Sequence, residues 1–144
     1  MEAPFVLPRE ASIEDPLRLA VLISGGGSGL SSILSFQSSE PRCHRTVLVL
    51  ADSENAGGLE HGRRAGITTR GIPLPQGLQS IERRLAHESI ILSQIESSGA
   101  ELVVLSGYMR ILTPSFVAKW KGRLLNIHPS LLPDFPGAHA HRDV

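Results

Sequence analysis

The sequence is poor in cysteine and has no net charge, and each shortage excludes a class of protein. Cys43 is the only cysteine, so the chain can form neither an internal disulfide nor a cysteine-based zinc cluster, and a reducing compartment suits it. Fourteen basic residues balance fourteen acidic ones. That balance gives no electrostatic reason to expect nucleic acid or a membrane surface as the partner.

Long apolar runs are also lacking. No stretch approaches the roughly 20 residues that a membrane helix needs. The first residues, Met1 to Pro4, have neither the basic region nor the apolar region of a secretory signal. We therefore expect a cytoplasmic protein.

What is present favours one folded domain. Hydrophobic residues make up 41% of the 144 residues and charged residues 19%, which favours a packed core over disorder. Pro4, Pro8 and Pro16 interrupt regular hydrogen bonding near the start. We expect residues 1–16 to form an irregular lead-in and residues 17–144 to form a single α/β domain.

Short apolar runs alternate with stretches that have helical features. The runs predict strands at residues 17–23, 46–51, 67–72, 102–105 and 124–128. The helical stretches cover residues 30–38, 57–66, 80–96 and 114–122. This alternation predicts an open, mostly parallel twisted sheet with helices on both faces, which is a Rossmann-like fold.

Local signals place the ends and faces of two helices. In the stretch 80–96, one stripe at helical spacing is expected to face the core, formed by Ile81, Leu85, Leu92 and Ile95. Gly99 is expected to end that helix. Thr113 and Pro114 have the pattern of an N-cap followed by a first-turn proline, and Gly122 stands where that helix should stop.

The glycine-rich loop after the first strand predicts a phosphate site. Four glycines lie within the five residues from Gly25 to Gly29, where a strand turns into a helix and backbone N–H groups can surround an anion. The spacing is neither that of a dinucleotide-binding loop nor that of an ATP-type P-loop. A plain tight turn is the alternative, but one or two glycines would satisfy a turn.

A polar pair at the end of the last strand predicts acyl-transfer chemistry. Asn126 and His128 are two residues apart, so both side chains are expected on one face of the strand. Polar groups on a buried strand are costly unless they find partners. An amide N–H can stabilise the oxyanion that forms when an amine attacks an acyl carbon. A nearby imidazole can move the proton or add positive charge.

Two other interpretations of the histidines stay open. His128 could be a core residue with satisfied hydrogen bonds, and His139 and His141 could be loop residues only. A metal site could also use these three histidines together with Asp134 or Asp143, although their spacing matches no strong metal motif.

Three segments, in matching order, resemble glycinamide ribonucleotide formyltransferases, a family of folate-dependent enzymes. The most specific is the run from Leu125 to Pro133, with the Phe-Pro-Gly at 135–137 and the His-Ala-His-Arg at 139–142. The segment 21–28 resembles the family's phosphate loop, and the segment 107–112 resembles its folate site. The resemblance extends from about residue 17 to the last residue and implies a Rossmann-like formyltransferase fold.

The resemblance also implies a reaction and a set of site residues. The formyl group of 10-formyltetrahydrofolate would pass to the amine of 5-phosphoribosylglycinamide, in purine biosynthesis, with small molecules as the partners and no metal. Asn126 and His128 would be catalytic, and His139 would lie behind them or beside the substrate. Backbone N–H groups of residues 27–29 would hold the substrate phosphate, that is Gly27, Ser28 and Gly29. The folate pocket would be lined by Met109, Arg110, Ile111 and Leu112.

The sequence departs from the family pattern in two places. Gly26 and Gly29 stand where many members carry asparagine, and either Arg83 or Arg84 would have to supply the basic residue that reaches the phosphate. Members of the family also continue with a loop that bears a catalytic aspartate, beyond the point where this sequence stops at Val144. We therefore expect a domain that is incomplete at its C-terminus and a last strand with an exposed edge.

Related chemistries remain as alternatives. The chain could be a non-catalytic remnant that binds phosphate or folate, a formyltransferase for another amine, or a formyltetrahydrofolate hydrolase. The Pro129–Ser130 continuation and the Phe-Pro-Gly run favour the purine enzyme, and the neutral charge disfavours a tRNA substrate.

Overall fold

The computed structural model describes residues 4–127, and within that range it contains five strands and four helices. The strands are β1 (Leu17–Ile23), β2 (His44–Ala51), β3 (Thr68–Gly71), β4 (Leu102–Ser106) and β5 (Leu124–Ile127). The helices are α1 (Ser28–Ser39), α2 (Leu59–Arg64), α3 (Ser80–Ser98) and α4 (Pro114–Lys119). Each expected element is present, with ends that shift by a few residues.

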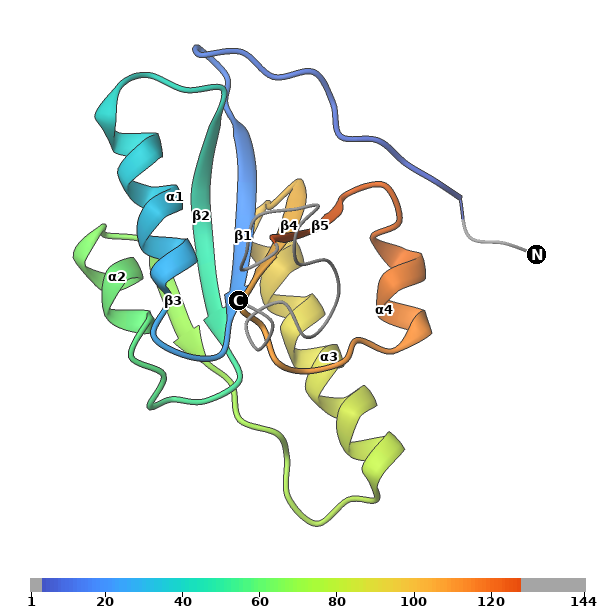
Figure 1. The fold of residues 1–144 in the computed structure, drawn as a ribbon. Coiled ribbons are helices and arrows are strands. Elements are labelled where there is room, and N and C mark those ends of the chain that lie inside the picture. Colours follow the sequence, from blue (N-terminus) through green and yellow to red (C-terminus); the bar gives the residue numbers. More distant parts are fainter. Residues whose placement is uncertain (1–3, 128–144) are drawn as a thin grey trace, which may run out of the picture.

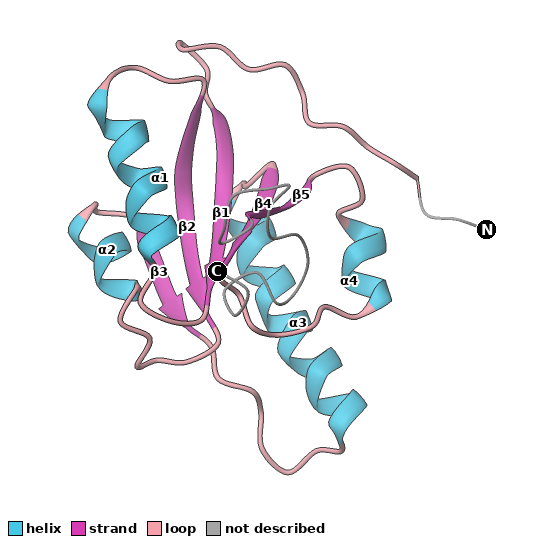
Figure 2. Ribbon diagram, in the orientation of Figure 1, coloured by secondary structure: helices cyan, strands magenta, loops and turns pink. Residues whose placement is uncertain are grey.

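The strands form one sheet in the order β3-β2-β1-β4-β5, and every neighbouring pair is parallel. In Figure 1, α1 and α2 cover one face of the sheet, whereas α3 and α4 cover the other. Figure 2 shows the same alternation of helices and strands by element type. Because all strands run the same way, the ends of β1, β4 and β5 lie at one rim, which we call the carboxyl rim.

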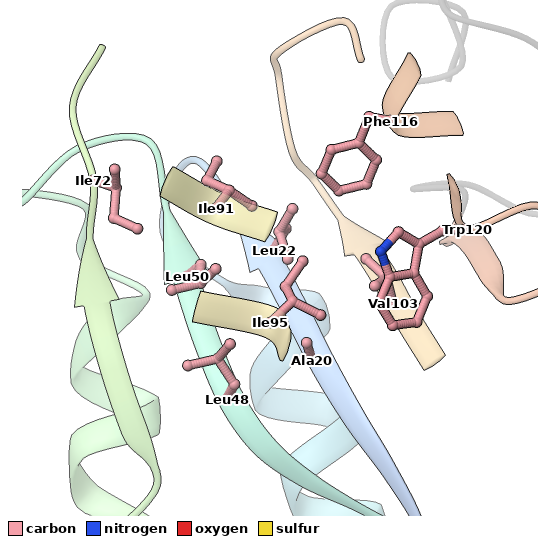
Figure 3. Close-up of a cluster of buried hydrophobic side chains, with 10 residues drawn as sticks. All are labelled: Ala20, Leu22, Leu48, Leu50, Ile72, Ile91, Ile95, Val103, Phe116 and Trp120. Carbon is pink, nitrogen blue, oxygen red and sulfur yellow. The ribbon is translucent and has the colours of Figure 1, made fainter. Parts of the chain in front are cut away.

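The two faces of the sheet carry separate apolar layers. Ala20 and Leu22 of β1 point to the α3 and α4 side, where they join Ile91, Ile95 and Phe116 (Figure 3). The intervening residues of β1 point to the α1 and α2 side, where they pack with Leu30 and Leu59. Every one of these side chains in β1 is at most 5% exposed. A central strand buried on both faces explains the continuous apolar run in the sequence.

The predicted apolar stripe of α3 is partly wrong. Ile81 and Leu85 are 54% and 45% exposed, and the fully buried positions of α3 are instead His87, Glu88, Ile91 and Ile95. Figure 1 shows why: the first turns of α3 extend past the sheet, so no strand lies beneath them. Helical spacing identifies a face, but it does not say how far along the helix that face is covered.

The predicted helix ends are confirmed by their geometry. Gly99 ends α3 in a left-handed conformation with φ of 75°. Thr113 caps α4 through its side-chain oxygen, which accepts a hydrogen bond from the backbone N–H of Phe116, and Pro114 follows as the first helical residue. Gly122 has φ of 93° and lies two residues beyond the C-cap residue, Trp120. These signals are local, so the sequence alone carries them.

The lead-in lies across the opposite rim, where the strands begin (Figure 1). The guanidinium of Arg9 contacts Glu101 through Nε, and its Nη2 donates to the second carboxylate oxygen over 3.0 Å. Arg9 also donates to the carbonyl oxygen of Pro16. Val6 N donates to the carbonyl oxygen of Lys121 over 2.9 Å. The described part of the lead-in is irregular, as expected, but it is tied to the sheet.

Strand β5 lies at one edge of the described sheet. Leu125 is 54% exposed and Ile127 is 40% exposed, which agrees with the expected exposed edge. His128 and the later residues, including Asp134, His139, His141 and Asp143, fall outside the described residues. None of the described helices is long and apolar enough to cross a membrane.

Candidate functional site

The glycine loop joins β1 to α1 at the carboxyl rim and is braced from behind by α2. Gly58 N donates to the carbonyl oxygen of Gly25 over 2.9 Å, and Nε2 of His61 lies 3.2 Å from the carbonyl oxygen of Gly26. Gly27 is the N-cap residue of α1, with φ of 71°. A Cβ on Gly27 would lie only 2.8 Å from the Cα of Gly58. Both its backbone angle and its contact with α2 therefore require glycine at this position.

The first turn of α1 offers N–H donors and carries no carboxylate. No side chain caps its N-terminus, and no acidic residue lies in the first turn. The first N–H groups of a helix have no partner within the helix, and the helix dipole favours negative charge beside them. This end of α1 can therefore accept an anion without competition from its own side chains.

A cavity of about 580 Å³ lies in front of this loop, and we call it the loop cavity. It is lined by the loop and α1 (Gly25, Gly26, Gly27, Ser28, Gly29, Ser32 and Ile33), by Ser106, Gly107 and Met109 after β4, and by Ile127 of β5. The three predicted phosphate residues and Met109 therefore meet in one space. That space extends across three neighbouring strands of the carboxyl rim.

The segment after β4 is held by its neighbours and leaves apolar side chains exposed. Met109 N donates to Oγ of Ser24 over 2.7 Å, and Arg84 donates to the carbonyl oxygen of Ile111 over 2.9 Å. Arg110 forms an ion pair with Asp52, also over 2.9 Å. Meanwhile Met109 is 72% exposed and Ile111 is 80% exposed. Such fixed backbone with free apolar side chains suits a flat aromatic ligand.

A second cavity, of about 260 Å³, lies on the α3 side of this segment. Its lining includes Met109, Arg110 and Ile111, together with Tyr108, Leu74 and the α3 residues Arg84, His87 and Glu88. Leu112 differs from the other predicted folate residues, because it packs against the core. Three of the four predicted folate residues thus line this cavity, whereas Leu112 packs against the core.

Tyr108 adds a protonated phenol to the second cavity. Partial burial raises the pKa of Tyr108, and the negative charge of Asp52 raises that pKa further. Because the acid form persists through the physiological range, the hydroxyl can donate a hydrogen bond but cannot act as a base.

Asn126 lies at the same rim but on the exposed edge strand. Its backbone pairs with Leu105 of β4, and the next pair along the ladder joins Ser106 to Ile127. Asn126 is exposed and immediately precedes Ile127, which lines the loop cavity. The structure therefore brings the amide-bearing strand end to the rim that carries the glycine loop. The direction of the His128 side chain lies outside the described residues.

Comparison with known proteins identifies the family. A model of the formyl transferase family matches residues 17–144. The chain belongs to the formyl transferase family. This match confirms the resemblance that the asparagine–histidine segment carries in the sequence.

Two relatives have names that agree with this family. The chain is 40% identical over 128 residues to phosphoribosylglycinamide formyltransferase of Escherichia coli, covering 89% of this chain and 58% of that protein. It is 41% identical over 128 residues to the trifunctional purine biosynthetic protein adenosine-3 of Gallus gallus, covering 89% of this chain and 12% of the relative. The chain thus spans little more than half the length of its bacterial relative.

A solved structure confirms the fold of this formyl transferase family member. Phosphoribosylglycinamide formyltransferase from Brucella melitensis superimposes with a TM-score of 0.76 at 38% sequence identity. The superposition covers 89% of this chain and 65% of that one. The expected Rossmann-like formyltransferase fold, with a parallel sheet between helices, is therefore correct.

Among residues 4–127, the expected basic partner for a phosphate does not line the loop cavity. Nε of Arg83 donates to the carbonyl oxygen of Pro75 over 2.8 Å, and Arg84 is bound to Ile111 as described above. Within residues 4–127, neither arginine lines the loop cavity. The polar groups that the described residues give to its lining are backbone groups and serine hydroxyls.

Sequence reasoning missed several polar side chains of the site. Ser24, Asp52 and Ser106 each stand at or just after the carboxyl end of a buried strand, and Glu88 lies on α3. Glu88 accepts hydrogen bonds from both N and Oγ1 of Thr113 and so holds the start of α4. A polar residue directly after an apolar strand was the available signal for the first three.

Within residues 4–127, no group of three or more histidine, cysteine, aspartate or glutamate side chains could hold a metal ion. The residues of the metal alternative, His128, His139, His141, Asp134 and Asp143, lie outside residues 4–127.

Proposed function

We propose that the protein transfers the formyl group of 10-formyltetrahydrofolate to the amine of 5-phosphoribosylglycinamide, a step of purine biosynthesis. The observation that carries this proposal is the loop cavity, which is lined by the glycine loop and by Ile127, the residue that follows Asn126 on β5. The name of the Escherichia coli relative supports phosphoribosylglycinamide as the acceptor, and that of the Gallus gallus relative supports purine biosynthesis. Both partners are small molecules, and the reaction uses no metal.

The substrate phosphate would bind at the start of α1. Backbone N–H groups of Gly27, Ser28 and Gly29 would donate to its oxygens, with the dipole of α1 adding to the attraction. This assignment is supported by the position of all three residues in the loop cavity and by the absence of an acidic residue from the first turn.

The folate would bind against the segment after β4. Met109, Arg110 and Ile111 would supply apolar and main-chain contacts, with Leu112 packed behind them. Met109 lines both cavities. A folate bound against this segment would therefore lie beside the phosphate-bearing substrate.

The chemical step would take place at the end of β5. The amine attacks the formyl carbon, the carbonyl oxygen becomes an oxyanion, and the amide N–H of Asn126 stabilises that oxygen. His128 moves the proton from the amine or stabilises the developing charge, and the C–N bond to tetrahydrofolate then breaks. His139 would assist from behind His128 or beside the substrate. No serine or cysteine nucleophile is needed, because the amine attacks directly.

Two further features belong to this proposal. The division into a lead-in at residues 1–16 and a formyltransferase domain at residues 17–144 is supported by the range of the family match. A cytoplasmic location is supported by the free, exposed Cys43, since a reducing compartment keeps such a thiol unpaired.

The test is an acceptor-dependent assay. The purified chain is mixed with 10-formyltetrahydrofolate, with and without 5-phosphoribosylglycinamide, and both the folate and the formylated product are quantified by mass spectrometry. We expect folate consumption only with the acceptor, matched by equal product. Consumption without the acceptor would indicate a hydrolase, and no consumption in either mixture would indicate a non-catalytic chain.

A further inference from the structure

Ser106 brings a hydroxyl group to the site. It is the last residue of β4, and its backbone pairs with Ile127 of β5. The residue is only 6% exposed. Because Ser106 also lines the loop cavity, its hydroxyl can pair with a group inside that cavity.

The hydroxyl of Ser106 lies directly against Gly29, in the first turn of α1. A Cβ on Gly29 would overlap Oγ of Ser106 and would lie 3.7 Å from its Cβ. Gly29 does not have the positive φ that would require glycine, and glycine destabilises a helix relative to alanine. The close approach of Ser106 therefore accounts for the glycine at this position.

The two groups converge on the same part of the loop cavity. Ser28 and Gly29 contribute N–H groups from the free first turn of α1, and Ser106 contributes an O–H group from the neighbouring strand end. A hydroxyl rotates freely and can direct its proton to an acceptor beside those N–H groups. An anion with several acceptor oxygens could bind all of these donors at once, as a phosphate does.

We propose that the Ser106 hydroxyl donates a hydrogen bond to the phosphate held by the glycine loop, so that β4 as well as α1 contributes to this subsite. The inference rests on the proposed function, because it assumes a phosphate-bearing substrate. In this proposal Ser106 binds the phosphate and takes no part in proton transfer at the amine. Its loss should therefore raise the KM for 5-phosphoribosylglycinamide and leave kcat nearly unchanged.

The first test measures inorganic phosphate binding to the 144-residue chain by calorimetry. For Ser106→Ala we expect the Kd to rise about tenfold, as for the loss of a hydrogen bond to a charged group. Ser31→Ala is the matched control, because Ser31 also lies on α1 but lines a different hollow with His61 and Arg64. Its Kd should equal that of the unaltered chain.

The second test uses the contact between Ser106 and Gly29. Gly29→Ala places a methyl group where Oγ of Ser106 now lies, so it should displace the hydroxyl and weaken phosphate binding. In the Ser106→Ala background the hydroxyl is already missing, so the same change should have a much smaller further effect. Such non-additivity is expected only of two positions that act through one contact.

The outcomes separate this inference from the proposed function. If the unaltered chain binds phosphate and Ser106→Ala binds it equally well, Ser106 has no role in the subsite and only this inference is overturned. Additive effects of the two substitutions would also overturn it. If the unaltered chain binds neither inorganic phosphate nor ribose 5-phosphate, the phosphate assignment of the glycine loop fails, and the proposed function fails with it.

Discussion

The two rims of the sheet use their polar groups in opposite ways. At the opposite rim, where the strands begin and which we call the amino rim, Arg9 and Arg18 each form an ion pair with Glu101, which also accepts a hydrogen bond from the backbone N–H of Arg18. At the carboxyl rim, the start of α1 has no side-chain cap, and it opens on the loop cavity, which Ser106 also lines. The difference is that ion pairs close one rim, whereas the other opens on a cavity in which we propose that a ligand binds.

The largest effect is expected when the side-chain amide of Asn126 is removed from the carboxyl rim. We expect Asn126→Ala to lower kcat on the order of 100- to 1000-fold, because an oxyanion would lose its donor. The melting temperature should change little, since Asn126 is exposed. Asn55→Ala is the matched control, because Asn55 is the only other asparagine and lies in an exposed turn. Equal kcat values for the two variants would contradict the oxyanion assignment.

A polar group near the carboxyl rim that is already paired should instead affect stability. Glu88→Ala leaves N and Oγ1 of Thr113 without their acceptor, so we expect a loss of about 2–3 kcal/mol in the free energy of unfolding. Urea denaturation measures this loss. The exposed Glu82 on the same helix is the control, and its replacement by alanine should cost less than about 1 kcal/mol. A similar cost at both positions would show that Glu88 is not the support for α4 that we describe.

Gly27 of the glycine loop can be compared with Gly66, where an added Cβ would meet no other atom within 4 Å. Gly27 and Gly66 have nearly equal φ, 71° and 73°, but only Gly27 contacts another backbone, that of Gly58. Replacement by alanine should cost each roughly 1–2 kcal/mol for its left-handed conformation. Gly27→Ala should cost more than Gly66→Ala, and it alone should lose the rise in melting temperature that phosphate produces. A loss of the phosphate effect in Gly66→Ala would contradict a local site.

The smallest expected effect is on stability at the amino rim, where the ion pair between Arg9 and Glu101 should depend on pH. The hydrogen bond from Arg9 lowers the pKa of Glu101. A lowered pKa in the folded state means that the pair stabilises the protein above the unfolded pKa, and that this contribution is lost as the pH falls through the folded pKa. Arg9→Ala should therefore destabilise the chain slightly at neutral pH, by less than Gly66→Ala does, and not at about pH 2. An equal effect at both pH values would mean that Arg9 acts by packing.

Much of the fold could be predicted because its signals are local. The buried run of β1, the glycine loop, Gly99 and the cap at Thr113 are set by neighbours in the sequence, and each was found where expected. The covered face of α3 could not be predicted, because it depends on how far the helix extends past the sheet.

For the candidate site, the sequence predicted the rim at which several of its residues lie. The loop residues and Met109 meet in one cavity, as the shared rim of a parallel sheet requires. Ser106 and Glu88 were missed as site residues because their roles arise from contacts with Gly29 and Thr113, which are distant in sequence. Leu112 was assigned to the folate pocket, and its packing against the core depends on the same tertiary detail.

The most direct test of the central claim is an amide NMR titration of the chain with ribose 5-phosphate. We predict that the largest chemical-shift changes occur at Gly27, Ser28 and Gly29 and saturate together. Glycines at other helix ends, such as Gly66 and Gly99, should not respond. If the largest changes instead fall at the amino rim, around Arg9 and Arg18, the claim that the carboxyl rim holds the phosphate is wrong.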